Sequence, residues 1–232
     1  MRLPTRLMAS MLSTASRPAL RGVVFDLDGT LSVPNLDFGE MYRRCGVSRD
    51  VDILEAIAAM PPAEAAKAQA VVDEMEEEGR RTLQLMPGAR DLARWLAAHN
   101  IPTALVTRNT RATVDHLHAE LWGGLPRFEP TIARDDGDLP PKPDPAALES
   151  IIGAWGAPPR ESVVMVGDSP TNDVLFGKAA GVRTALVDTG RRYGEGGSTE
   201  GADIVVDGLH GLAAKLHEAY ELPRAGPLKK YP

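Results

Sequence analysis

Short apolar runs alternate with amphipathic stretches through most of this chain. The runs with the length and composition of buried strands are 22–25, 103–106, a short one within 128–133, 163–166, 182–187 and 204–206. Apolar residues at helical spacing predict helices over 89–98, 111–121, 146–155, 171–180 and 209–220. Strand and helix in alternation predict an α/β fold, a Rossmann-like parallel sheet with helices on both faces.

Residues 35–86 depart from this pattern because they contain no strand-like run. Alanine, glutamate and apolar residues recur there at helical spacing. One helix is predicted over 51–57 with Asp50 as its N-cap, and another from Pro62 to about residue 85. The predicted domains are a core of residues 19–34 and 87–222 and a small helical cap of residues 35–86, inserted after the first strand.

The second cap helix carries a group of acidic residues. These are Glu74, Glu76, Glu77 and Glu78. Arg80 and Arg81 follow them at the spacing of ion pairs on one helix. The pattern predicts a solvated helix face.

The first residues of the chain differ in composition from the rest. No acidic residue precedes Asp26, whereas serines recur among arginines such as Arg2 and Arg6. Such a composition is typical of a mitochondrial or chloroplast transit peptide. Residues 1–18 are therefore expected to be a transit peptide, or else a disordered extension on a cytoplasmic protein. Residues 223–232 are expected to be a flexible tail.

Composition narrows the classes of partner. The 232 residues are 43% hydrophobic and 25% charged, which is ordinary for a globular protein with a full core. The net charge of −6 argues against nucleic acid as a main partner, since nucleic acid requires a basic face. Cys45 is the single cysteine, so neither an internal disulfide nor a thiolate metal cluster is predicted. No apolar run approaches the length of a membrane-spanning helix.

Polar residues follow the predicted core strands. They are Asp26 and Asp28 after the first strand, Thr107, Arg108 and Asn109 after the second, Lys142 in a proline-rich segment after the third, and Asp168 and Asp173 after the fourth. The carboxyl ends of parallel strands share one edge of a sheet, where open α/β sheets bind ligands. We therefore expect these side chains to converge.

Clustered carboxylates at such an edge suit a hard divalent cation, and one of them can act as a nucleophile while another moves protons. Each residue also has a purely structural interpretation. Residues 26–29 fit an Asx turn, Thr107 can cap the turn after it, Lys142 can lie on the surface and Asp173 can begin a helix. Convergence from four strand ends favours the functional interpretation.

At these motifs the sequence resembles the haloacid dehalogenase-like hydrolase superfamily, from about residue 22 to residue 220. The matching positions are residues 25–31 for the family's first motif, Thr107 for the second, Lys142 for the third, and Gly167, Asp168 and Asp173 for the fourth. Their order and spacing match as well. The helical insert lies where the family's subclass with a small helical cap carries one.

The resemblance implies a role for each motif residue. Asp26 would be the nucleophile that forms an aspartyl-phosphate, and Asp28 would serve as general acid and then as general base. Asp168 and Asp173 would hold Mg²⁺ together with Asp26 and the backbone carbonyl of Asp28. Lys142 would balance the acids and bind the phosphoryl group.

Thr107 would also donate to the phosphoryl oxygens. Many relatives follow this residue directly with an asparagine that touches phosphate, whereas here Arg108 precedes Asn109. Our hypothesis is that Asn109 binds substrate and that Arg108 faces the mouth of the site, where its guanidinium binds an anionic part of the substrate. The alternative is a surface arginine. Arg191 and Arg192 are weaker candidates for the same rim.

The activity expected from the resemblance is Mg²⁺-dependent hydrolysis of a small phosphorylated metabolite. The sequence is most similar to phosphoglycolate phosphatase-like proteins, some of which share the segment at residues 34–38, expected at the cap hinge. Asp28 argues against haloacid dehalogenation, because true dehalogenases lack this acid. A nucleotide or sugar-phosphate phosphatase, a phosphomutase and a non-catalytic binding module remain as alternatives.

Overall fold

A parallel sheet forms the centre of the protein. The structure, a computed structural model, describes residues 17–193 and 197–225, so nearly all of the predicted transit peptide and most of the predicted tail lie outside the described residues. The strands are β1 (Gly22–Phe25), β2 (Thr103–Val106), β3 (Thr131–Ile132), β4 (Val163–Gly167), β5 (Arg183–Val187) and β6 (Ile204–Val206). Their order is β3-β2-β1-β4-β5-β6, and every pairing is parallel. The predicted α/β sheet is therefore confirmed.

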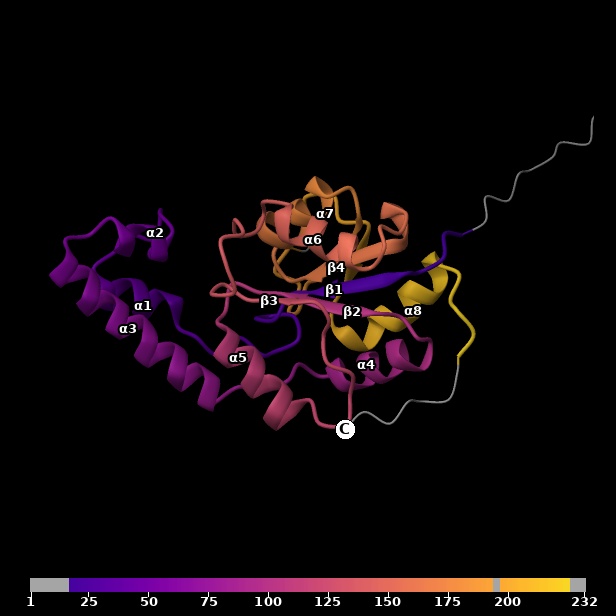
Figure 1. Ribbon diagram of the computed structural model, residues 1–232, viewed down its shortest axis with the longest axis horizontal. Helices are drawn as coiled ribbons and strands as arrows, with labels where there is room; N and C mark the ends of the chain where they lie inside the picture. Colours follow the sequence, from indigo (N-terminus) through magenta and orange to yellow (C-terminus); the bar gives the residue numbers. More distant parts are fainter. Residues whose placement is uncertain (1–16, 194–196, 226–232) are drawn as a thin grey trace, which may run out of the picture.

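Helices cover both faces of the sheet (Figure 1). They are α4 (Ala89–Ala98), α5 (Arg111–His116), α6 (Ala146–Ala154), α7 (Leu175–Ala179) and α8 (Leu209–Ala219). Residues of α4, α5 and α8 pack on one face, and residues of α6 and α7 pack on the other. In β1 the neighbouring residues Val23 and Val24 belong to these opposite clusters, because successive strand side chains point to opposite faces.

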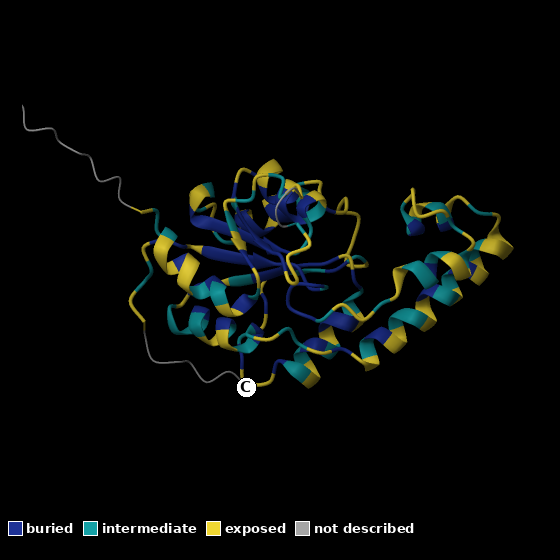
Figure 2. Ribbon diagram, turned by 180° about the vertical axis from the view of Figure 1, so that it is seen from behind, coloured by how far each residue is buried: buried dark blue, intermediate teal, exposed yellow. Residues whose placement is uncertain are grey.

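The cap is a separate helical unit beside the sheet (Figures 1 and 2). It consists of α1 (Phe38–Cys45), α2 (Ile53–Ala58) and α3 (Pro62–Arg81), all within the predicted insert. The cap has its own small core, formed by Met41, Ile53, Ile57, Ala68 and Val72. Figure 2 shows that the central strands β1, β2, β4 and β5 are almost uniformly buried, whereas the cap helices alternate between buried and exposed residues. The sheet is therefore the more deeply enclosed part of the protein.

The structure corrects the predicted ends of the cap helices. The N-cap of α2 is Asp52, whose carboxylate accepts hydrogen bonds from Leu54 N at 3.0 Å and Glu55 N at 3.2 Å, so the prediction of Asp50 is wrong. Helix α3 ends at Arg81, because the segment after it pairs with the segment that leads from β1 into the cap. Met86 N donates to Leu31 O at 2.8 Å within this pairing, which forms the hinge between cap and core.

Other differences concern short or irregular elements. Helix α1 has no counterpart among the predicted helices, although Phe38, Met41, Tyr42 and Cys45 recur at helical spacing in its eight residues. The helix predicted over 111–121 changes to a π-helical turn, η1 (Leu117–Leu121), after α5. The helix predicted over 171–180 likewise begins with a π-helical turn, η3 (Pro170–Val174), before α7. A 3-10 turn, η2 (Arg160–Ser162), precedes β4.

Candidate active site

The first strand places Asp26 at the carboxyl edge of the sheet. Asp26 N donates to Val166 O at 2.9 Å, so the β1–β4 pairing extends to the residue that carries the carboxylate. Gly29 then turns the chain with a φ of 80°, which only glycine adopts readily. A side chain at Gly29 would also lie 2.3 Å from Asp168 Oδ2. The glycine is therefore required for the close approach of the acidic loop after β4.

Lys142 joins two buried carboxylates. Its Nζ donates to Asp26 Oδ1 at 2.5 Å and to Asp173 Oδ1 at 2.6 Å. The Lys142 side chain is 3% exposed, so the interpretation of a surface lysine is wrong. Burial by itself would lower the pKa of Lys142, but the two carboxylates outweigh it and hold this pKa above its ordinary value. The ammonium group therefore stays charged.

Burial raises the pKa of Asp26 well above its ordinary value, although Lys142 opposes this shift. Asp173 is 2% exposed and lies in η3, where its Oδ2 accepts a hydrogen bond from Ser169 N at 3.0 Å. Asp173 does lie in the first turn of a helix, as the structural alternative predicts, but it is also buried and paired with Lys142. The three side chains form one hydrogen-bonded unit at the sheet edge.

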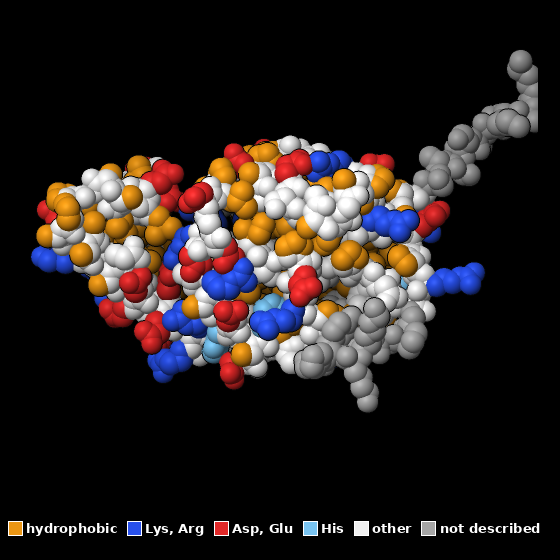
Figure 3. Space-filling model, viewed as in Figure 1, with side chains coloured by type: hydrophobic (Ala, Val, Ile, Leu, Met, Phe, Trp, Pro, Cys, Tyr) orange, Lys and Arg blue, Asp and Glu red, His pale blue; other side chains and the backbone are white. Residues whose placement is uncertain are grey.

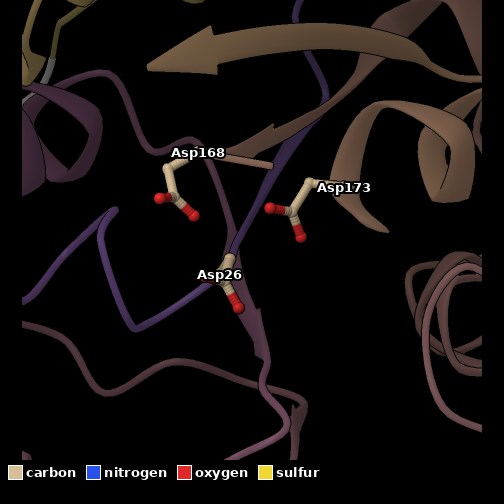
Figure 4. A group of neighbouring side chains, drawn as sticks. All are labelled: Asp26, Asp168 and Asp173. Carbon is tan, nitrogen blue, oxygen red and sulfur yellow. The ribbon is translucent and has the colours of Figure 1, made fainter. Parts of the chain in front are cut away.

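Three of the acids at this edge lie close enough together that they could hold a divalent cation. Figure 4 shows Asp26, Asp168 and Asp173 around a common space, and one oxygen of each lies within 4.8 Å of the others. Opposite ligands of an octahedral Mg²⁺ are about 4 Å apart, so small side-chain adjustments would bring these oxygens into range. Burial also raises the pKa of Asp168.

The charge of the cluster agrees with this geometry. The four acids are Asp26, Asp28, Asp168 and Asp173, and the two cations that pair with them are Lys142 and Arg192. Two negative charges are therefore left uncompensated when all the acids are ionised. Buried like charges are costly without a counter-charge, which a divalent cation with oxygen ligands would supply.

Asp28 occupies a different position from the other acids. Its carboxylate lies outside the group of three and accepts hydrogen bonds from Asn109 Nδ2 at 3.2 and 3.3 Å. Burial raises the pKa of Asp28, although the hydrogen bond from Asn109 opposes it. A raised pKa favours the protonated carboxyl, which is the form that a general acid requires.

The segment after β2 brings Arg108 and Asn109 to the site cavity, whereas Thr107, directly before them, does not line that cavity. Thr107 Oγ1 accepts a hydrogen bond from Asn109 N at 3.0 Å, so Thr107 does cap the following turn. The hydroxyl hydrogen of Thr107 can still be donated to a ligand, since a hydroxyl both donates and accepts. Arg108 reaches across to the cap and forms an ion pair with Asp52. It is therefore not a surface arginine that faces only solvent.

A second ion pair joins the core to the cap. Arg134, after β3, donates to both carboxylate oxygens of Glu76 at 2.7 and 2.9 Å. Glu76 is only 11% exposed, so the prediction that its whole glutamate group is solvated is wrong for this residue. Glu74 pairs with Arg44 of α1, and only Glu78 pairs within the helix, with Arg81.

A cavity of about 480 Å³ lies between the cap and the strand ends. Its lining includes all four acids, Lys142 and Asn109, together with Arg108, Arg134 and their cap partners. The predicted hinge segment contributes Pro34, Asn35, Leu36 and Phe38 to the same cavity. Figure 3 shows the notch between the two units, with basic and acidic side chains near it.

Of the two predicted rim arginines, Arg192 lines the cavity and Arg191 is exposed beside it. Arg192 donates to Asp168 Oδ2 at 2.9 Å and to Asp168 O at 3.2 Å. It therefore contacts one of the acids of the cluster. Sequence reasoning missed Asp52, Glu76 and Arg134, because no local pattern distinguishes them from other charged residues.

Comparison with known proteins agrees with the strand-end geometry. Residues 20–181 match the haloacid dehalogenase-like hydrolase family. The chain belongs to this family. A haloacid dehalogenase-like hydrolase domain-containing protein of Arabidopsis thaliana is 36% identical over 225 residues, which are 91% of this chain and 89% of that relative. Phosphoglycolate phosphatase 1 of Pseudomonas aeruginosa is 33% identical over 226 residues, which are 87% of this chain and 82% of that relative.

Solved structures of the family have the same fold. A hydrolase from Pseudomonas syringae superposes with a TM-score of 0.69 at 20% identity, over 87% of this chain and 100% of that chain. A hydrolase of the same superfamily from Geobacter sulfurreducens superposes with a TM-score of 0.57 at 18% identity, over 87% and 99% of the two chains. The predicted family, fold and enzyme class are confirmed. Among the described residues, no helix is long and apolar enough to cross a membrane.

Proposed function

We propose that this hydrolase is a Mg²⁺-dependent phosphatase for a small phosphate monoester, similar to the phosphoglycolate phosphatases among its relatives. The observation that carries the proposal is the unit of Asp26, Lys142 and Asp173, buried at the base of the cavity and flanked by Asp28 and Asp168. Phosphoryl transfer requires a nucleophile, charge neutralisation and a proton for the leaving group, and these side chains offer all three.

The acidic cluster is the proposed binding site of the Mg²⁺ cofactor. Asp26, Asp168 and Asp173 would hold Mg²⁺, with the backbone carbonyl of Asp28 as a further ligand implied by the family resemblance. When bound, the cation neutralises charge on the phosphoryl group and on the acids. The remaining chemistry belongs to side chains of the protein.

In the first step, a carboxylate oxygen of Asp26 attacks phosphorus and the bond from phosphorus to the leaving alcohol breaks. Lys142 fixes the Asp26 carboxylate by binding its Oδ1. The protonated carboxyl of Asp28 gives its hydrogen to the leaving oxygen, so the alcohol departs neutral. The products of this step are an aspartyl-phosphate on Asp26 and an ionised Asp28.

In the second step, Asp28 takes a proton from a water molecule that attacks the same phosphorus. The bond between phosphorus and Asp26 breaks, inorganic phosphate forms and both aspartates return to their starting states. Lys142, the Thr107 hydroxyl and the Asn109 amide would donate to the phosphoryl oxygens in both steps. The cap encloses the site, which favours small esters over phosphoproteins.

The decisive experiment measures phosphate release from a panel of small esters, including phosphoglycolate, sugar phosphates and nucleotides, with Mg²⁺ or with EDTA. We expect Mg²⁺-dependent release by the wild type and none by Asp26→Asn. Asp207→Asn is the matched control, because Asp207 is exposed and distant in sequence from every motif. A peptide with one phosphoryl group on Asp26, found by mass spectrometry after acid quench, would identify the intermediate.

Two results would contradict the proposal. Folded wild type that releases phosphate from none of the esters in Mg²⁺ would exclude general phosphatase activity and favour a phosphomutase or a binding module. Full activity of Asp26→Asn would exclude Asp26 as the nucleophile. The best ester of the panel would separate phosphoglycolate from sugar-phosphate and nucleotide substrates.

We also propose that residues 1–18 direct import into a mitochondrion or chloroplast. The support is their acid-free composition, which contains arginine and serine. A fluorescent protein fused after these residues should enter an organelle, and its Arg2→Glu, Arg6→Glu variant should remain in the cytoplasm. Cytoplasmic fluorescence of the unaltered fusion would contradict the proposal.

A further inference from the structure

Two arginines from the core form the side of the cavity that faces the cap. Arg108 follows β2 and Arg134 follows β3, and the two are in contact because Arg134 Nη1 donates to Arg108 O at 3.3 Å. Each reaches an acid of the cap, Asp52 for Arg108 and Glu76 for Arg134. A basic wall of the cavity is thus covered by cap carboxylates.

The two ion pairs differ in how firmly they are held. The Arg134–Glu76 pair is bidentate, with the side chains 25% and 11% exposed. In the Arg108–Asp52 pair the side chains are 41% and 26% exposed. Exposed ion pairs contribute little net free energy, so the pair of Arg108 is the one that a ligand can replace.

Asp52 keeps its other partners when Arg108 leaves. Its Oδ1 accepts the hydrogen bonds from Leu54 N and Glu55 N, while Oδ2 faces Arg108. The carboxylate therefore remains the N-cap of α2 in either state. Exchange of Arg108 from Asp52 to another anion breaks one contact and makes one of the same kind.

The position of Arg108 determines which part of a substrate it would meet. Arg108 lies between Thr107, whose Oγ1 accepts a hydrogen bond from Asn109 N, and Asn109, whose amide donates to the Asp28 carboxylate at 3.2 Å. In the proposed mechanism Asp28 protonates the leaving oxygen. The Cα atom of Arg108 is therefore about 3.8 Å from that of Asn109. Arg108 also lines the same cavity as Asp28, so its side chain shares that cavity with the leaving-group side of the site.

We propose that Arg108 is a specificity-determining residue that exchanges Asp52 for a second anionic group on the leaving part of the substrate. The substrate class is then a short phosphate monoester that carries a carboxylate or a second phosphate. Arg134 and Glu76 remain paired and keep the cap in place. This inference rests on the proposed phosphatase function, and a guanidinium is suited to either anion because it binds their oxygens in a bidentate manner.

The test compares esters that share a two-carbon leaving group. They are phosphoglycolate, ethylene glycol bisphosphate and 2-hydroxyethyl phosphate, assayed in Mg²⁺ with the full chain. For the wild type we expect kcat/KM to be higher for an anionic ester than for 2-hydroxyethyl phosphate. The preferred anion distinguishes a carboxylate from a second phosphate.

Matched variants test the residue itself. Arg108→Gln should lower kcat/KM for the preferred anionic ester roughly tenfold to a hundredfold, the loss of a hydrogen-bonded charge pair, and leave 2-hydroxyethyl phosphate nearly unchanged. Asp52→Asn keeps an N-cap acceptor but removes the competing charge, so it should lower KM for the anionic ester. Arg94→Gln removes an exposed arginine of α4 and should change neither ester.

The outcomes separate this inference from the proposed function. If Arg108→Gln lowers kcat/KM by the same factor for all three esters and its melting temperature is unchanged, the role of Arg108 is overturned. The phosphatase function would still stand. A wild type that does not distinguish the anionic esters from 2-hydroxyethyl phosphate would overturn it as well. Failure of the wild type to hydrolyse any ester would overturn the proposed function and this inference with it.

Discussion

The strand-end site and the cap contacts use charged residues in opposite ways. At the strand ends, Lys142 and its carboxylate partners are almost completely buried and are joined to one another by ion pairs. At the cap, Arg108 and Asp52 are considerably exposed and belong to units joined through a hinge. A buried charge without its partner is costly, whereas an exposed one is solvated by water. The comparison indicates that the groups proposed for catalysis keep their buried partners. The group proposed for substrate selection, Arg108, can exchange its partner.

The largest effect is expected from the buried lysine. Lys142→Met would leave Asp26 and Asp173 facing each other without their shared cation, so the free energy of unfolding should fall by about 3–5 kcal/mol. Phosphate release should be lost as well. Urea unfolding at pH 7 in EDTA measures the change. The matched variant Arg108→Met should lose less than about 1 kcal/mol, and equal losses would contradict the proposed difference between the regions.

Metal addition tests the carboxylate cluster without any substrate. Mg²⁺ should raise the melting temperature of the wild type, because a ligand that binds only the folded state stabilises that state. At a ligand concentration a hundredfold above Kd, the free energy of unfolding rises by about 2.7 kcal/mol. Asp168→Asn removes one of the three grouped carboxylates and should reduce this rise. The exposed variant Asp207→Asn should retain it. An unchanged melting temperature of the wild type would exclude the metal site.

A smaller effect is expected at the more buried of the cap contacts. Glu76→Gln removes the charge that holds Arg134 and should lower the free energy of unfolding by about 1–2 kcal/mol. Glu77→Gln is the matched control on the next residue, which is exposed, and should change it by less than about 0.5 kcal/mol. Both values come from denaturant unfolding. Identical values would mean that the Arg134–Glu76 contact does not stabilise the cap.

The effect that is smallest at pH 7 and grows only in acid concerns His118, a half-buried histidine. Burial lowers the pKa of His118 to about 4 from its ordinary value of 6.5, where the ring packs on Phe128. Between these values the unfolded chain binds a proton that the folded chain does not, so stability should fall as pH falls from 6.5 toward 4. His118→Gln should flatten this part of the pH dependence of unfolding. If His118→Gln leaves the pH dependence of unfolding unchanged, that dependence is caused by other titratable groups.

Much of the fold was predictable because its signals are local. Apolar runs predicted the limits of every strand except β3 within one residue, and β2 and α4 match their predicted limits. For β3 only the wider range 128–133 was predicted. The π-helical turns were not predictable, since their sequence has the same periodicity as a regular helix. The N-cap of α2 was assigned to Asp50 because Asp50 and Asp52 are equivalent as sequence signals, and only the position of the helix distinguishes them.

The sequence by itself determined which residues gather at the sheet edge. A parallel sheet brings the ends of its strands together wherever they lie in the chain, so Asp26 and Lys142 meet across more than a hundred positions. Only the tertiary structure decided how the cap meets the core. Glu76 and Glu77 are alike in sequence, and the rotation of α3 about its axis and its docking angle select Glu76 as the partner of Arg134. No local propensity encodes that choice, because it depends on the packing of two separate units against each other.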